Sequence, residues 1–427
     1  MSIALTFIIL PNVRARLAVQ PDTGQFRSGG YVEDRRPCRI LPAIVFSQFA
    51  GTSLWFAGNA VLPDLQLQFG LGQSAVATIT SAVQLGFIAG TLVFAVLNLS
   101  DRFSPRSVFL ACSAFGALAN GGIALLANIG HPYETLLGMR FATGFFLAGI
   151  YPVGMKLAAS WYREGLGAAL GFLVGALVIG TAFPHLVKGL GHSLPWEEVT
   201  WWLSGLALTG GIVMYMLLPD GPHHAKGTRL DLGAIVAIFA SRDLRASAFG
   251  YFGHMWELYT LWAMIPLMIA GYVEMHTLGA VNVGLWSFWV IAVGAIGCVA
   301  GGLVSRHVGS ANVAFTQLSL SGLCCLLSPL AYVLPLPAFI AFLTVWGIFV
   351  VGDSPQFSAL TATTAPRAFV GSALTIVNCI GFSITVVSIQ VTSMLTAHAP
   401  FQAWFVPVAI GPVLGLSACR RLVRPMR

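Results

Sequence analysis

Residues 144–155 read GFFLAGIYPVGM, and residues 347–358 read GIFVVGDSPQFS. Both stretches are largely apolar, and they share two glycines and one proline at identical spacing: Gly144, Gly149 and Pro152 in the first, and Gly347, Gly352 and Pro355 in the second. The match continues into the next segment, where the paired residues are Arg163, Gly167, Ala169 and Leu170 in one copy and Arg367, Gly371, Ala373 and Leu374 in the other. Single matches of Gly or Ala are common in apolar helices, but several in one register indicate an internal repeat, so we expect two related halves.

Composition places the chain in a bilayer. Of its 427 residues, 57% are hydrophobic and only 9% are charged, and the mean hydropathy is +0.82. Soluble domains carry about 25% charged residues. Although the net charge is +7, the basic residues are spread over short loops and tails, which excludes a nucleic-acid-binding surface. The seven cysteines show no metal-ligand spacing, so we expect free thiols and no metal site.

Apolar segments long enough to cross a bilayer occur twelve times. The predicted spans are 41–62, 74–98, 107–128, 134–157, 165–187, 199–219, 247–271, 280–304, 311–334, 337–358, 369–396 and 403–419. All but two of the 22 Lys and Arg residues then fall on one side, which the positive-inside rule assigns to the cytoplasm. The exceptions are Lys188 and Arg140. We predict an all-α integral protein of the plasma (inner) membrane, with twelve spans in two six-helix pseudo-repeats and both termini cytoplasmic.

This topology divides the chain into four parts. They are a disordered cytoplasmic N-terminal extension (1–39), a first six-helix half (40–219), a cytoplasmic middle loop (220–246) and a second half with a short basic tail (247–427). Within the middle loop, the apolar stretch 232–240 follows Asp231, which is a suitable N-cap. It is either a short helix along the inner membrane surface or part of a flexible linker.

Cysteine labelling tests the orientation. Ser193→Cys, in the 188–198 loop, should react with an impermeant maleimide in intact cells. Thr228→Cys, in the middle loop, should react only after the cells are permeabilised. The reverse pattern of accessibility would refute the proposed topology.

The loop between the second and third spans, residues 97–106, reads LNLSDRFSPR. It resembles a loop of the major facilitator superfamily with the pattern Gly-x-Leu-Ala-Asp-Arg-x-Gly-Arg-Lys/Arg. Asp101, Arg102 and Arg106 match this pattern, whereas both glycines are missing. The resemblance covers essentially all of residues 40–424.

Two further spans bear on the same resemblance. In the fourth span, Arg140 followed by Gly144 and Gly149 is similar to the family's arginine and glycine-rich pattern. In the fifth span, Gly171 and Gly180 have the eight-residue gap of the family's antiporter pattern, but Pro184 comes one residue early and lacks the glycine before it.

The resemblance implies a secondary active transporter of a small solute that works by alternating access, and we expect it to be proton-coupled. The alternatives are a uniporter or an anion exchanger without proton coupling, and a transporter-like receptor or assembly factor. Because no phosphate-binding loop, nucleophile elbow or zinc-binding HExxH pattern occurs, we expect neither enzyme activity nor a cofactor. The expected partners are a small-molecule substrate, protons and the lipid bilayer, and the expected state is a monomer.

Few ionisable residues lie deep inside the spans. A charge there costs at least ~2.5–3.5 kcal/mol on insertion scales, so Arg140, His254, Glu257 and Asp353 need a reason to be present. The resemblance implies that their spans line the central cavity. His254 and Glu257 are three residues apart and share a helix face. We predict that this pair carries the coupled proton, because a desolvated carboxylate beside an imidazole can exchange a proton near neutral pH.

Each of these residues also has a second interpretation. His254 and Glu257 could instead be a structural pair that bridges the seventh span to a neighbour. Asp353 is a further proton-coupling candidate or part of an inner gate. Arg140 is predicted to hold an anionic substrate or to tune a carboxylate, and the alternative is a structural hydrogen bond to freed backbone carbonyls near Gly144.

Aromatic and amide side chains complete the expected substrate site, although each of them can also serve packing alone. Together with Arg140, the predicted substrate-binding residues are Gln48, Trp55, Asn59, Tyr251, Trp256, Tyr259 and Asn378.

The resemblance also implies a gate at the cytoplasmic surface. It places Asp101 against the N-terminus of the eleventh span, where the helix dipole favours an anion. Arg102, Arg106 and Arg163 are expected to join this gating network.

Overall fold

The computed structural model of the protein describes residues 37–128, 131–162, 166–191, 194–222, 231, 233–396 and 398–423. The expected N-terminal extension lies outside these residues except for positions 37–39, and so do Arg163 and residues 223–230 of the middle loop. All of the described residues belong to one compact unit, Pro37–Arg427.

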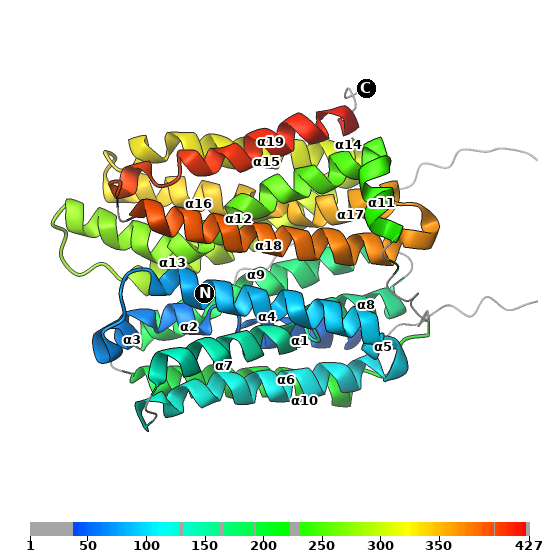
Figure 1. Ribbon diagram of the computed structural model, residues 1–427, viewed down its shortest axis with the longest axis horizontal. Coiled ribbons are helices and arrows are strands. Elements are labelled where there is room, and N and C mark those ends of the chain that lie inside the picture. The colour runs from blue at the N-terminus through cyan, green and yellow to red at the C-terminus, as the bar shows by residue number, and fades with distance from the viewer. Residues whose placement is uncertain are drawn as a thin grey trace, which may run out of the picture. The chain divides into compact units, whose positions relative to one another are not determined.

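Every regular element among the described residues is a helix (Figure 1). In chain order they are α1 (Ile40–Thr52), α2 (Ala57–Ala60), α3 (Leu62–Phe69), α4 (Ala75–Leu97), α5 (Leu99–Arg102), α6 (Pro105–Gly122), η1 (Ile123–Asn128), α7 (Pro132–Leu147), α8 (Tyr151–Trp161), α9 (Leu166–Leu190), α10 (Trp196–Leu217), α11 (Gly233–Ala240), α12 (Arg242–Met275), α13 (Val283–Ala292), α14 (Gly294–Val308), α15 (Ser310–Ala331), α16 (Leu336–Gly352), α17 (Ser354–Thr364), η2 (Arg367–Phe369), α18 (Val370–Thr396), η3 (Phe401–Ala403), η4 (Pro407–Ala409), α19 (Ile410–Cys419) and η5 (Arg420–Leu422).

The all-α, twelve-span prediction is confirmed. Within the described residues, 11 helical segments are long and apolar enough to cross a membrane, and the shorter apolar helix α1 begins the remaining span. Helix ends differ from the predicted ones by a few residues at most places. One clear difference is at α12, which begins at Arg242 because Ser241 accepts a hydrogen bond from the backbone N–H of Leu244 and so caps the helix.

The first span is not the continuous helix that was expected. α1 ends at Thr52, and α2 and α3 follow after a stretch of turns. The hydroxyl groups of Thr52 and Ser53 donate to the carbonyls of Gln48 and Ala50. Such bonds from side chain to backbone compete with the helical ladder and favour a bend, so the carbonyls that follow need other partners.

The sequence repeat is visible as two matching broken helices. α7 gives way to α8 just before Pro152, and α16 gives way to α17 just before Pro355. Proline lacks an N–H and clashes with the preceding turn, which ends each first segment. Gly144 and Gly347 are also equivalent, because an added Cβ on either would lie 2.0 Å from a backbone carbonyl oxygen of the neighbouring span.

The middle loop contains a helix, as one of the two interpretations predicted. α11 is capped at its start, where the backbone N–H of Gly233 donates to Oδ1 of Asp231 at 2.7 Å. The helix packs on α12 and α18. Its side chains Ile235, Val236 and Phe239 stay exposed, which suits a helix that lies at the edge of a bilayer.

The two halves meet along two pairs of spans. α9 packs on α13 and α14, and α4 packs on α18. α5 and α11 lie at one end of the bundle, called the α11 end below, and α3 lies at the opposite end, called the α3 end (Figure 1). Both broken helices run from their break towards the α11 end, so their breaks face each other in the middle of the bundle (Figure 1).

Candidate functional site

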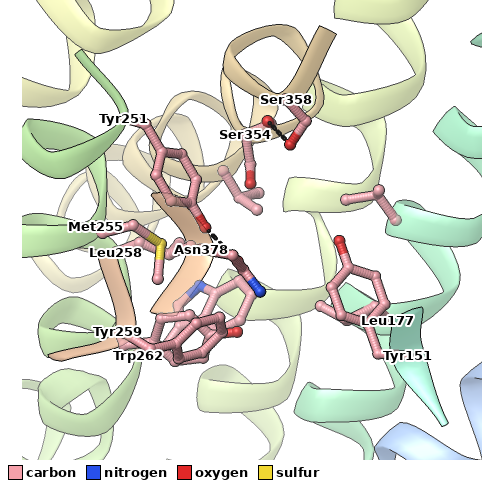
Figure 2. A pocket seen from close by; sticks show the side chains of 13 residues that line it. Tyr151, Leu177, Tyr251, Met255, Leu258, Tyr259, Trp262, Ser354, Ser358 and Asn378 are labelled. Carbon is pink, nitrogen blue, oxygen red and sulfur yellow. Dashed lines mark hydrogen bonds between the residues drawn. The ribbon is translucent and has the colours of Figure 1, made fainter. Parts of the chain in front are cut away.

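A cavity lies between the halves at the level of the two breaks (Figure 2). α8 and α9 form one wall, and α12, α16, α17 and α18 form the other. The lining residues are Tyr151, Val174, Leu177, Tyr251, Met255, Leu258, Tyr259, Trp262, Val351, Ser354, Ser358, Asn378 and Phe382. None of these side chains is charged. The arrangement provides apolar contact area together with a few convergent hydroxyl and amide groups, which is typical of a small-molecule site.

The lining residues differ in exposure. Tyr151, Ser354 and Asn378 are half-buried, whereas Tyr259 and Trp262 are only 4% and 1% exposed. Tyr151 and Ser354 begin α8 and α17, which run towards the α11 end. The most buried part of the lining is therefore its layer of aromatic rings.

Aromatic rings close the cavity towards the α3 end. Trp55 stacks on Tyr259 with ring centroids 5.7 Å apart and packs on Phe382 at the same separation. Phe56 meets the edge of Trp262 at 6.3 Å. The layer joins the broken first span to α12 and α18, so it depends on the bend after α1.

Two hydrogen bonds seal the α3 end beyond this layer. Nδ2 of Asn282 donates to the carbonyl of Gly189 at 2.8 Å, and Nε2 of Gln390 donates to Oγ of Ser81 at 2.9 Å. Each bond joins one half to the other. Because a transporter that opens at this end must break both bonds, they mark the described state as closed there.

A pair of glycines allows the closest backbone approach in this seal. An added Cβ on Gly284 would lie 2.9 Å from Cα of Gly189, and one on Gly189 would lie 2.7 Å from the backbone nitrogen of Leu285. Gly284→Val should therefore disfavour closure of the α3 end. Overpacking costs about 1–3 kcal/mol, which corresponds to a population shift of about 5- to 150-fold.

The measurement is the rate at which an impermeant maleimide labels Ser81→Cys, with the same protein lacking that cysteine as the blank. We expect the rate to rise about tenfold when Gly284→Val is added. Gly279→Val is the matched control, because nothing lies within 4 Å of a Cβ at that position. An unchanged labelling rate in Gly284→Val would show that the glycine contact does not hold this end closed.

A buried histidine–aspartate pair lies behind the cavity wall. Nδ1 of His254 is 2.8 Å from Oδ1 of Asp353, and the two side chains are 1% and 0% exposed. Asp353 stands between α16 and α17 and directly precedes the lining residue Ser354, while His254 directly precedes the lining residue Met255. Nε2 of His254 and Oδ2 of Asp353 have no hydrogen-bond partner. Buried polar atoms without partners are rare and mark a place where a proton or a ligand can be accepted.

Glu257 has different neighbours from those expected. Its carboxylate accepts hydrogen bonds from Nε1 of Trp346 at 2.7 Å, from Oγ of Ser321 at 2.9 Å and from Sγ of Cys325 at 3.3 Å. It does not line the cavity, and His254 pairs with Asp353 instead. Side chains three residues apart diverge by about 60° around a helix, so one points to α17 and the other to α15 and α16. The expected contact between His254 and Glu257 is therefore wrong.

Arg140 takes the structural role that was the alternative. Its Nη1 donates to the carbonyl of Leu54 at 3.0 Å, and its Nη2 donates to the carbonyl of Trp55. These are carbonyls freed by the bend in the first span, and not carbonyls near Gly144. The side chain is fully buried and does not line the cavity. Arg140 thus stabilises the bend that positions Trp55.

Three of the predicted substrate residues line the cavity together. Tyr251, Tyr259 and Asn378 come from α12 and α18, and the hydroxyl of Tyr251 donates to Oδ1 of Asn378 at 2.8 Å (Figure 2). This bond fixes the amide orientation and leaves Nδ2 of Asn378 to face a ligand.

The other predicted substrate residues lie outside the cavity. Trp55 belongs to the aromatic layer already described. Nδ2 of Asn59 donates to Oγ1 of Thr80 within the first half. Gln48 approaches Gly154 of α8, and Trp256 packs against Gly411 of α19. A side chain on a cavity-lining span can face away from the cavity, as those of Gln48, Asn59 and Trp256 do.

The expected gating residues do not form a described network with α18. Nη1 of Arg106 donates to the carbonyl of Leu218, and its guanidinium lies 5.3 Å from the ring centroid of Tyr215, so it binds α10 of its own half. Arg102 is exposed. The side chain of Asp101 and the whole of Arg163 lie outside the described residues. Asn98 adopts the left-handed conformation at the end of α4, where asparagine is tolerated, so this turn needs no glycine.

Residues missed from the sequence include Tyr151, Ser354, Ser358 and Phe382. The first two are equivalent positions of the repeat, each directly before a proline. Glycine- or proline-interrupted spans at corresponding places in two halves are a known pointer to a binding site. Tyr151 and Ser354 could therefore have been predicted from the repeat.

Comparisons with known proteins agree with this architecture. A family model described as Major Facilitator Superfamily matches residues 44–389. An Escherichia coli O157:H7 protein, named as the uncharacterized transporter YgaY, is 26% identical over 214 residues, which are 48% of this chain. The chain spans about half the length of that relative, 52%.

Two solved structures share the fold. The human organic anion transporter MFSD10 (TETRAN) is 15% identical, with a TM-score of 0.68 over 90% of this chain and 100% of that chain. A bacterial homologue of the human lysosomal transporter Spinster, in an inward-facing and occupied conformation, is 13% identical, with a TM-score of 0.67 over 90% of this chain and 96% of that chain. At these identities the likeness concerns the fold alone.

Proposed function

The chain belongs to the major facilitator superfamily, and from this premise we propose that it is a secondary active transporter that couples a small solute to protons by alternating access. The family supports membrane transport. Transport by this chain, the proton as the coupled ion, the residues that carry the proton and the orientation in the membrane are the proposal.

The observation that carries proton coupling is the His254–Asp353 pair. Both side chains are buried beside the cavity and both keep an unpartnered polar atom. Intramembrane acids are expensive to insert and are usually functional. The pair also ties α12 to the break between α16 and α17. A proton on Asp353 would weaken this tie, so α17 could then move relative to α12 as the cavity changes sides.

Glu257 is a weaker proton-coupling candidate in this arrangement. Three donors already occupy its carboxylate, and it lies away from the solute cavity. A group that carries protons in a coupled cycle has to lie beside the solute or between the moving helices. The His254–Asp353 pair meets this requirement better than Glu257 does.

The α11 end is proposed to face the cytoplasm of the cell across its plasma (inner) membrane. Arg102, Arg106, Arg242, Arg245 and Arg306 lie in helices or loops at that end, in keeping with the positive-inside bias. The hydrogen bonds at the α3 end would then close the described state to the outside. Closing the α11 end would bring the 97–106 loop towards α18, where Asp101 remains the proposed gating anion.

Transport by the purified full chain in proteoliposomes tests the function. Candidate solutes are added under an imposed pH gradient, and solute uptake is followed together with internal pH. Proton coupling predicts solute movement against its concentration gradient and a matching pH change. Solute movement that ignores the pH gradient would indicate a uniporter or an exchanger, and specific binding without any movement would indicate a receptor or assembly factor.

A further inference from the structure

The cavity wall is rich in aromatic rings and holds no positive charge. Tyr151, Tyr259 and Trp262 are among five aromatic residues in the lining. The face of an aromatic ring attracts cations, most strongly for tryptophan and tyrosine. Of the nearby basic residues in the described chain, Arg140 is committed to the carbonyls of the first span, and neither it nor Lys156 lines the cavity. An anionic group in this cavity would have no counter-charge in its wall.

A source of negative charge lies directly behind the same wall. When His254 is neutral and Asp353 is ionised, the pair carries one net negative charge, and the carboxylate keeps Oδ2 without a hydrogen-bond partner. A buried carboxylate that lacks a cationic partner is costly in a low-dielectric environment. A cation in the adjoining cavity would relieve that cost, even without direct contact, because charges interact over longer distances where the dielectric constant is low.

The remaining polar atoms of the wall suit an uncharged hydrogen-bonding group. Nε1 of Trp262 is buried without a partner. Oδ1 of Asn378 accepts from Tyr251, which directs the Nδ2 donor of the same amide away from that bond. The hydroxyl groups of Tyr151 and Tyr259 also face the cavity (Figure 2). A hydroxyl or ether oxygen on the ligand could accept from these donors.

We infer that the cavity binds a small aromatic organic cation. Its positive group is attracted by the aromatic faces and by Asp353, and an oxygen on its ring is held by Trp262 or Asn378. This inference rests on the proposed function, since it names the solute class of the same cavity. It adds a claim that the proposed function does not make, namely that the sign of the ligand's charge decides binding.

Equilibrium binding tests the inference without any transport. Three test ligands of one shape differ in charge: 3-hydroxyphenyltrimethylammonium, its neutral carbon isostere 3-tert-butylphenol, and the anion 3-hydroxybenzenesulfonate. Isothermal titration calorimetry on the full chain, with the heats from protein-free detergent subtracted, gives the three dissociation constants. The cation should bind at least about tenfold more tightly than the neutral isostere, since cation–π contacts and a counter-charge each contribute on that scale.

A variant of Asp353 tests whether the preference for the cation depends on this carboxylate. In Asp353→Asn the preference for the cation over the neutral isostere should shrink to about threefold or less. Glu274→Gln is the matched control, because Glu274 is an exposed acid near the C-terminal end of α12, beyond the cavity-lining residues, and it should keep the full preference.

The comparison of the three ligands on the unaltered protein tests the inference even if Asp353→Asn does not fold. Equal or tighter binding of the neutral isostere or of the sulfonate would overturn the inference. Cation binding that persists without any proton-coupled transport would instead overturn the proposed function and leave the ligand class standing.

Discussion

Asp353→Asn is expected to abolish the uphill accumulation of solute and to leave solute exchange in place. The amide keeps the size of the carboxyl group but can no longer gain and lose a proton. With one proton per solute and a gradient of one pH unit, the unaltered protein can concentrate the solute about tenfold, because one pH unit is worth ~1.4 kcal/mol. In the variant the ratio of inside to outside concentration should fall to about one under the same gradient.

The measurement uses proteoliposomes with an imposed pH gradient for accumulation, and proteoliposomes preloaded with solute for exchange. Exchange is measured at saturating solute, since the variant should also bind a cationic solute more weakly. Glu257→Gln is the matched comparison, because it neutralises a second buried acid of the same half that lies outside the cavity. It should still accumulate solute.

The opposite result would reassign the proton. If Glu257→Gln loses uphill accumulation while Asp353→Asn keeps it, Glu257 carries the coupled proton, as its position on the seventh span suggested. If both variants accumulate solute like the unaltered protein, neither acid is the coupling site.

Arg140→Met should lower the free energy of unfolding by about 2–4 kcal/mol, since it leaves two buried carbonyls unpaired and removes packed volume. Methionine keeps an unbranched apolar stem but cannot donate to Leu54 and Trp55. The bend after α1 would lose its main support, and Trp55 would lose its fixed place in the aromatic layer. The measurement is unfolding of the purified protein in detergent, followed by tryptophan fluorescence.

Arg421→Met is the control for this variant. Nη2 of Arg421 lies 3.0 Å from Oδ1 of Asp243, but the two side chains are 45% and 59% exposed. Exposed ion pairs contribute little, so the control should change stability by less than about 1 kcal/mol. A stable Arg140→Met that has lost ligand binding would contradict the structural role and restore the original prediction that Arg140 holds the substrate.

Much of the architecture could be predicted because it depends on local patterns. The twelve apolar segments follow from the hydrophobicity of consecutive residues, and the orientation follows from the bias of Lys and Arg. The repeat follows from the match between Gly144–Pro152 and Gly347–Pro355. The break in the first span was missed because the residues from Thr52 to Phe56 are apolar or small, as in a continuous span. The hydrogen bonds from the hydroxyl groups of Thr52 and Ser53 to backbone carbonyls, which accompany the break, cannot be identified from the sequence.

The partners of the buried charged residues could not be predicted from local patterns. Sequence spacing placed His254 and Glu257 on one helix face, but the angle between them lets one meet Asp353 of the tenth span and the other meet Trp346 and Ser321. These contacts join residues far apart in the chain, and small rotations of packed helices decide them. Spacing along one helix therefore could not identify the pair.

The sequence by itself determined the membrane class, the two-fold internal repeat, and the burial of Arg140, His254, Glu257 and Asp353 in their spans, although it missed the buried His185. Only the tertiary structure decided which of those residues meet: Asp353 with His254, Glu257 with its three donors, and Arg140 with the bent first span. The physical reason is that hydrophobicity and charge bias are summed over a segment, whereas a hydrogen bond depends on the position of single atoms to within a fraction of an ångström.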